Sequence, residues 1–233
     1  MSSSQRALSA AAGVRDGVGG NAVHPGASRA RCRLPFLTLA LSLAALAVWA
    51  LPGVAAALQF DRAALGAGEW WRFVTGHWAH WSGEHLAWDL VVFAVFGAML
   101  EARSRRGLAV VVAGAALAIS GAVALGARSL AFYRGLSGID SALFTAFFAQ
   151  LLGDARRERA VLPALVPAVA LLGFVGKAVY ELVTGATLFV SADSTFVVVP
   201  LAHVVGAGVG AAVVVAQGTF RCATLLRTEP QPT

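Results

Sequence analysis

The sequence predicts an all-α membrane protein with six transmembrane helices. Two observations lead to this prediction. First, 58% of the 233 residues are hydrophobic and only 13% are charged, with a mean hydropathy of +0.73, which is too apolar for a soluble domain of this length. Second, stretches of roughly 17 to 25 apolar residues, long enough to cross a bilayer, recur along the chain. They fall at about 34–57, 84–101, 107–127, 137–152, 160–188 and 195–217.

The segments around these stretches define the predicted organisation. Residues 1–33 are rich in Ser, Ala, Gly and Arg and have few large apolar side chains, so we expect a disordered cytoplasmic tail. The membrane domain then covers 34–218, and 219–233 form a cytoplasmic C-terminal tail. The stretch from about 58 to 83 lacks a clean spanning run and holds four tryptophans, which prefer the boundary between water and lipid. We expect it to form an interfacial first loop on the outer side.

The basic residues indicate the orientation in the membrane. The chain has 18 Lys and Arg against 12 Asp and Glu, a net charge of +6, which would also suit a nucleic-acid-binding protein. Most of the arginines, however, lie in the N-terminal tail, the second and fourth connections and the C-terminal end. The positive-inside rule therefore places both termini in the cytoplasm of a bacterial-type inner (plasma) membrane. We expect the lipid bilayer, and no nucleic acid, as a partner.

Ser137 is the first candidate for chemistry. It stands in Tyr-Arg-Gly-Leu-Ser-Gly-Ile-Asp, residues 133–140, where a loop on the outer side turns into the fourth helix. A serine at this place is also a common helix cap, and the motif alone favours that interpretation. His203, in the outer part of the sixth helix, lies at a similar depth by topology. An imidazole within reach can remove the proton of a serine hydroxyl, and a helix N-terminus offers N–H groups to an oxyanion.

Small residues would let these two helices approach each other. Gly138, Ala142 and Thr145 follow Ser137 at near-helical spacing, and Gly206 and Gly210 follow His203 as a stripe of small residues. Ordinary packing explains the glycines equally well. It does not explain a serine and a histidine at the outer ends of the same two helices.

Other ionisable residues inside predicted spans need separate interpretations. His85 and Asp89 are four residues apart and share one helix face. Together with His77 and His80 they could supply metal ligands, but no recognised ligand spacing is present, so we expect no metal and no cofactor. Lys177 and Glu181, also four apart, are expected to neutralise each other as a buried pair. Glu101, beside three arginines, is expected to be a structural charge at a helix end.

Taken together, the chain resembles a rhomboid intramembrane serine protease from about Leu34 to Gly218. The resemblance implies a six-helix rhomboid-like bundle whose Ser-His dyad opens to a water-filled cavity on the outer side, with no third acidic member. It implies Ser137 as nucleophile, His203 as general base and His85 as a residue that holds the oxyanion. The matching positions are Trp71-Arg72, His80, His85, the Gly-x-Ser-Gly at Gly135 to Gly138, and His203 followed by Gly206.

One position departs from the family pattern. Rhomboids usually have Asn four residues after the histidine of the second helix, and this chain has Asp89. An ionised carboxylate would repel an oxyanion. Either Asp89 is neutral, or it pairs with His85 and leaves stabilisation to His85 and to the backbone at Gly135 and Leu136. Asp140, one turn beyond Ser137, is expected in the same polar cluster.

Within the rhomboids, the short chain is similar to the rhombosortase branch. The similar segments are the one around Ser137 and Lys177-x-x-Tyr180-Glu181. This similarity implies membrane-associated protein substrates with a C-terminal Gly-Gly motif, a hydrophobic helix and a basic tail, and a site that Glu181 helps to shape. Two alternatives remain: a catalytically inert rhomboid-like protein that binds membrane clients, and a small transporter, which would require repeat symmetry that the sequence lacks.

Overall fold

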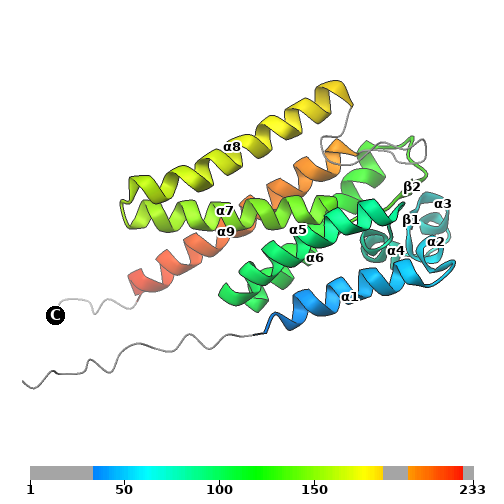
Figure 1. Ribbon diagram of the computed structural model, residues 1–233, viewed down its shortest axis with the longest axis horizontal. Coiled ribbons are helices and arrows are strands. Elements are labelled where there is room, and N and C mark those ends of the chain that lie inside the picture. Colours follow the sequence, from blue (N-terminus) through cyan, green and yellow to red (C-terminus); the bar gives the residue numbers. More distant parts are fainter. Residues whose placement is uncertain (1–33, 186–198, 228–233) are drawn as a thin grey trace, which may run out of the picture. The chain divides into compact units, whose positions relative to one another are not determined.

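The computed structural model describes residues 34–185 and 199–227, with side chains up to residue 218. Six long helices occur in this part of the chain, at the predicted places (Figure 1). They are α1 (Phe36–Ala50), α5 (Gly83–Arg103), α6 (Arg105–Gly126), α7 (Ser137–Arg157), α8 (Val161–Thr184) and α9 (Pro200–Arg227). The predicted tail at 1–33 lies outside the described residues.

Four of these helices are long and apolar enough to cross a membrane: α5, α6, α8 and residues 200–218 of α9. The described part of the chain is therefore that of a multi-pass membrane protein. α1 has 15 residues, or about 22 Å at 1.5 Å per residue, which is shorter than the roughly 30 Å hydrocarbon core. α7 is absent from the candidate spans, so the structure supports four spans and not all six that the sequence predicts.

Several predicted helix ends were wrong because of local breakers. The helix predicted over 34–57 ends at Ala50, since Pro52 and Gly53, with a φ of +78°, interrupt it before α2 (Val54–Leu58). α8 stops at Thr184 because Gly185 adopts a left-handed C-cap conformation. α9 continues to Arg227, so the predicted tail at 219–233 begins as helix; residues 195–198 and 228–233 lie outside the described residues.

The connection between α2 and α5 folds into short elements at one end of the long helices (Figure 1). They are β1 (Phe60–Asp61), α3 (Arg62–Gly66), α4 (Arg72–Thr75) and the 3-10 turn η1 (Gly76–Trp78). β1 pairs antiparallel with β2 (Phe132–Tyr133), the strand just before α7. Trp70 and Trp71 are exposed, whereas Trp78 is buried and donates its indole N–H to the Leu41 carbonyl.

Polar side chains fix the helix ends. Glu101 accepts hydrogen bonds from the backbone N–H groups of Leu37 and Thr38 and from the Thr38 hydroxyl, and it pairs with Arg105. It thereby satisfies the N-terminus of α1 from the end of α5. This contact agrees with the structural role predicted for Glu101 and explains why a carboxylate is buried there.

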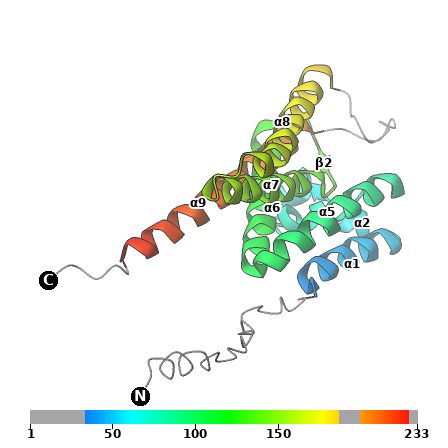
Figure 2. The same cartoon turned by 60° about the vertical axis from the view of Figure 1, so that its left-hand side comes forward.

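α7 lies in the middle of the helices and contacts α5, α6, α8 and α9, while α1 packs on α5 (Figures 1 and 2). The backbones of α7 and α9 approach each other too closely for a side chain at two glycines of α9. A Cβ atom on Gly206 would lie 1.9 Å from the Gly138 carbonyl oxygen, and one on Gly210 would lie 2.2 Å from that of Ala142. The predicted contact between the small-residue faces of these helices is confirmed.

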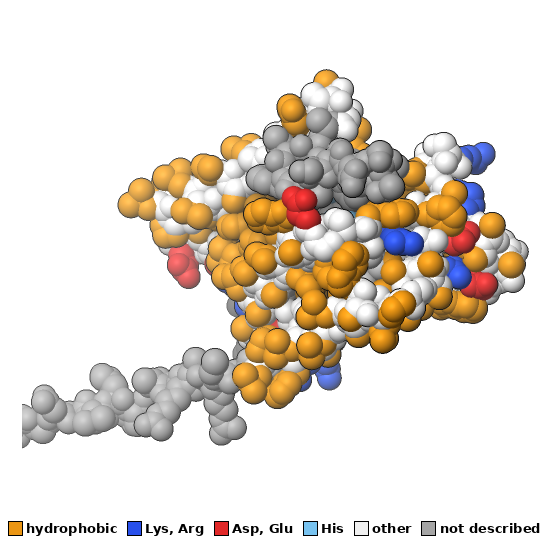
Figure 3. All heavy atoms as spheres, turned by 45° about the vertical axis from the view of Figure 1, so that its right-hand side comes forward, with side chains coloured by type: hydrophobic (Ala, Val, Ile, Leu, Met, Phe, Trp, Pro, Cys, Tyr) orange, Lys and Arg blue, Asp and Glu red, His pale blue; other side chains and the backbone are white. Residues whose placement is uncertain are grey.

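The outer surface of the helices is apolar. Hydrophobic side chains spread over most of the face in Figure 3, as expected of a surface that meets lipid. α8 shows the pattern most clearly, because its exposed large side chains are all apolar or aromatic, whereas its only buried residues are Pro167 and Glu181. A carboxylate is thus the one charged group that α8 turns inward among its described residues.

Candidate active site

Ser137 and His203 are in direct contact. Ser137 is the first residue of α7, and its Oγ lies 3.1 Å from Nε2 of His203 on α9. The residue in the N-cap position is Leu136, and the serine hydroxyl faces the histidine instead of capping the helix. The close approach at Gly138 and Gly206 explains this contact, because each glycine lies within one turn of its reactive neighbour.

The second nitrogen of the histidine also has a partner. His203 Nδ1 lies 2.9 Å from Oε2 of Glu181, and the other oxygen of this carboxylate lies 2.6 Å from Nζ of Lys177. An ionised carboxylate only accepts hydrogen bonds, which assigns the proton of neutral His203 to Nδ1 and leaves Nε2 to accept from Ser137. The predicted Lys177–Glu181 pair is present, and the same carboxylate also contacts His203, where the resemblance implies a dyad with no third acidic member.

Asp89 holds the loop in front of Ser137. Its Oδ2 accepts the Leu136 backbone N–H at 2.9 Å and lies 3.2 Å from Nε2 of both His80 and His85. This geometry matches the predicted alternative in which Asp89 pairs with His85. His80 was not among the site residues that the sequence predicts, because its contact with Asp89 forms only when the loop folds back over α5.

The backbone of this loop needs a glycine. Gly135 has a φ of +121°, and a Cβ there would lie 2.7 Å from Cε1 of His85. Since the Leu136 N–H is engaged by Asp89, the N–H groups left for an oxyanion are those of the first turn of α7, beginning at Ser137 and Gly138. The predicted support residues therefore lie together, with Leu136 acting as an anchor of the loop.

Tyr133 and Asp140 complete the buried polar cluster. Asp140 is buried, and Oδ1 of its carboxyl group has no hydrogen-bond partner in the described part of the chain. Burial, together with the nearby charges of Asp89 and Asp140, raises the pKa of the Tyr133 phenol, so this group stays protonated. Tyr133 was missed from the sequence, where it appears only as an aromatic residue near the serine motif.

His77 lies on η1 and has a structural role. Its Nε2 contacts the Ala116 carbonyl at 3.0 Å and the Ser120 hydroxyl at 3.1 Å, which ties η1 to α6. Burial lowers its pKa from the usual 6.5 to about 4, so the ring is neutral at physiological pH. Within residues 34–185 and 199–218, no three His, Cys, Asp or Glu side chains are grouped to hold a metal ion.

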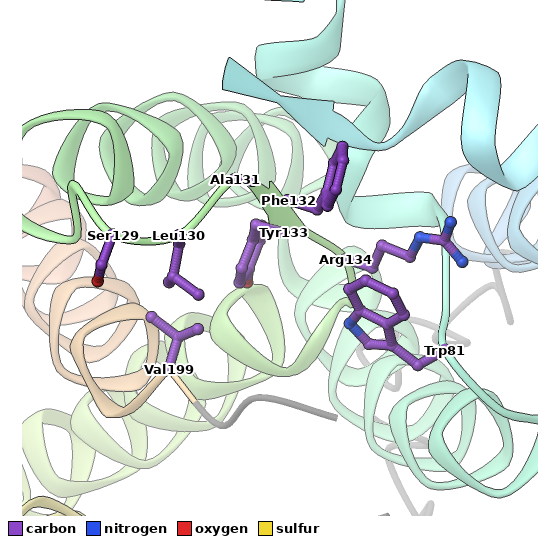
Figure 4. A pocket seen from close by; sticks show the side chains of 8 residues that line it. All are labelled: Trp81, Ser129, Leu130, Ala131, Phe132, Tyr133, Arg134 and Val199. Carbon is purple, nitrogen blue, oxygen red and sulfur yellow. The ribbon is translucent and has the colours of Figure 1, made fainter. Parts of the chain in front are cut away.

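A pocket of about 310 Å³ lies beside the strand that leads to Ser137 (Figure 4). Residues 129–134 form one wall, and Trp81 and Val199 close it. The Arg134 guanidinium stacks over Trp81 at 4.3 Å from the ring centroid, and its Nε donates to Gln59 Oε1. The chain passes from this wall through Gly135 to Ser137, so the pocket and the serine share one loop.

The fold and the site define a multi-pass helical membrane protein with a serine-histidine pair near the N-terminal ends of two closely packed helices. A model of the rhomboid domain matches residues 67–219, which include Ser137, Glu181 and His203. The chain belongs to the rhomboid family. Members of this family are generally intramembrane serine proteases, although some are inactive. None of the curated proteins compared with the chain matches it.

Proposed function

We propose that this rhomboid is an active intramembrane serine endopeptidase, with Ser137 as nucleophile and His203 as general base. The observation that supports it best is the 3.1 Å contact between Ser137 Oγ and His203 Nε2. A serine hydroxyl requires such a base at neutral pH. The same contact argues against an inert client-binding protein, because nothing in such a protein requires the pair to meet.

The chemistry follows from the tautomer of His203. Nε2 takes the proton of the Ser137 hydroxyl as Oγ attacks the scissile carbonyl carbon, and the carbonyl oxygen becomes an oxyanion facing the first N–H groups of α7. The protonated histidine then gives its proton to the leaving amine, and the C–N bond breaks to leave an acyl-enzyme. Water, deprotonated by His203, attacks the ester carbonyl and releases the acid, and the proton returns to Oγ.

Asp89 fits this scheme as a residue that shapes the oxyanion pocket. Its Oδ2 accepts the Leu136 backbone N–H and lies 3.2 Å from Nε2 of both His80 and His85. The carboxylate is thus engaged with the loop before α7 and with two imidazole rings, and in this proposal it supports the pocket without contacting the oxyanion itself. This arrangement removes the main argument for an inert protein, which was the replacement of Asn by Asp at this position.

The substrates that we propose are membrane-anchored proteins, or secreted proteins with a C-terminal hydrophobic helix that carries a Gly-Gly sorting signal. The support is the similarity to the rhombosortase branch together with the apolar outer surface, along which a substrate helix can approach through lipid (Figure 3). Two glycines also favour unwinding, since Gly is about 1 kcal/mol poorer than Ala in a helix. An unwound segment is needed before its carbonyl can meet Ser137.

The test is cleavage in proteoliposomes of a reporter that ends in Gly-Gly, an apolar helix and a basic tail. Wild type is compared with Ser137→Ala and His203→Ala, and product masses give the bond that is cut. Ser141→Ala is the matched control, because it removes a hydroxyl one turn further along α7 that bonds the Ser137 carbonyl. Cleavage that persists in Ser137→Ala would falsify the proposal.

A fluorophosphonate probe separates an inert protein from an enzyme whose substrate is wrong. We expect the probe to label wild type and Ser141→Ala and to leave Ser137→Ala unlabelled. Absence of labelling in folded wild-type protein would favour the inert alternative. Labelling without cleavage of the Gly-Gly reporter would leave the endopeptidase in place and exclude the proposed substrate class.

A further inference from the structure

α8 is the least buried of the candidate spans, yet it carries a buried carboxylate. Glu181 is 2% exposed, while the large side chains that α8 leaves exposed are apolar or aromatic. Moving a carboxylate out of water costs several kcal/mol unless partners compensate it. A feature this costly on an otherwise apolar helix calls for a specific role.

The ion pair with Lys177 does not account for the position of Glu181. Both residues are on α8, four apart, so this pair is local to one helix and does not require the carboxylate to contact α9. It also uses only one carboxylate oxygen, Oε1, and the lysine side chain is 23% exposed. The second oxygen, Oε2, reaches across to α9 and lies 2.9 Å from Nδ1 of His203.

We propose that Glu181 is a positioning residue for the reaction of Ser137, acting through His203. This inference rests on the proposed endopeptidase function. The carboxylate holds the imidazole with Nδ1 protonated and Nε2 aimed at Ser137 Oγ, and it stabilises the imidazolium that forms when the serine proton is transferred. The chain thus carries Ser137, Glu181 and His203 as a triad, contributed by α7, α8 and α9.

Lys177 has a supporting part in this arrangement. When His203 is neutral, the ammonium group compensates the buried carboxylate through Oε1. When His203 accepts the serine proton, Oε2 already lies within hydrogen-bond distance of the new cation, so no side chain has to move. Such preorganised charge is the usual way in which a buried site lowers the energy of a charged transition state.

The first experiment compares kcat and KM for the Gly-Gly reporter in Glu181→Gln, Glu181→Asp and the double variant Glu181→Gln with Lys177→Gln. We expect Glu181→Gln to lower kcat roughly 10²- to 10⁴-fold, the range expected when a histidine loses its orienting carboxylate, with little change in KM. Glu181→Asp keeps a carboxylate and should recover part of kcat.

The double variant tests the purely structural alternative. If Glu181 serves only to neutralise Lys177, removing both charges restores kcat, and the inference is wrong. If Glu181 acts through His203, the double variant stays as slow as Glu181→Gln. Thermal unfolding of each variant in detergent checks folding, and the comparison of Glu181→Asp with wild type remains informative where Glu181→Gln does not fold.

A double-mutant cycle shows whether Glu181 works through the histidine. In the His203→Ala background, Glu181→Gln should cost less than twofold in residual rate, because the residue it orients is gone. If Glu181→Gln lowers the rate as much in the His203→Ala background as it does in wild type, the inference is wrong. The two proposals can fail separately: activity in Ser137→Ala refutes the endopeptidase itself, whereas a dead Ser137→Ala with a fully active Glu181→Gln refutes only the triad.

Discussion

The contact between α7 and α9 gives a prediction that depends on one methyl group. Gly206→Ala would place a Cβ 1.9 Å from the Gly138 carbonyl oxygen, and side chains essentially never approach closer than 3.0 Å. The two helices must therefore separate by at least about 1.1 Å at this point. His203 lies one turn before Gly206, so the same movement lengthens its 3.1 Å contact with Ser137 beyond a hydrogen bond.

Misplacement by about 1 Å can cost on the order of 10²-fold in rate, and overpacking of this kind typically costs about 1 to 3 kcal/mol in stability. We expect Gly206→Ala to lose both activity and stability. Activity is measured as kcat/KM in proteoliposomes, and stability is measured by thermal unfolding in detergent. Gly208→Ala is the matched control, because a Cβ there meets nothing within 4 Å. The two variants behaving alike would refute the argument that backbone contact aligns the pair.

Two further predictions concern the surroundings of the pair. Asp89→Asn should keep most of the activity, because its amide oxygen can still accept the Leu136 N–H. Asp89→Leu cannot accept this hydrogen bond and should lose the activity. A folded but inactive Asp89→Asn variant would show that the charge is required. Burial lowers the pKa of His77 from 6.5 to about 4, so below pH 6.5 the unfolded chain binds a proton that the folded protein does not. The free energy of unfolding therefore falls by about 3 kcal/mol between pH 6.5 and pH 4. Thermal unfolding from pH 7.5 to 4 should therefore depend on pH less steeply in His77→Gln, and an equal slope would contradict this assignment.

Much of the helical framework could be predicted from the sequence because hydropathy and length report directly on the bilayer. The starts of α5, α7 and α8 lie within one residue of the predictions, since Ser82 caps α5 and Gly135 bends the chain before α7. The ends were less accurate. Pro52, Gly53 and Gly185 act as breakers inside apolar runs, where hydropathy alone gives no signal to stop.

The pairing of Ser137 with His203 could also be predicted, because small residues mark both helices at the point of contact. Two partners of Asp89, His80 and the Leu136 N–H, could not, since they depend on how the segments before α5 and before α7 fold together. Local spacing indicates which residues share a helix face. It carries no information on which backbone N–H a carboxylate will meet from another element.

Glu181 shows how a correct local prediction can conceal a tertiary contact. The spacing to Lys177 explains one carboxylate oxygen completely, and spacing alone does not indicate a partner for the other. In the fold, α8 and α9 bring that second oxygen to His203. An i, i+4 partner on a lipid-facing helix can therefore coexist with a second contact to a neighbouring helix, because a carboxylate has two oxygens and a local pair engages only one of them.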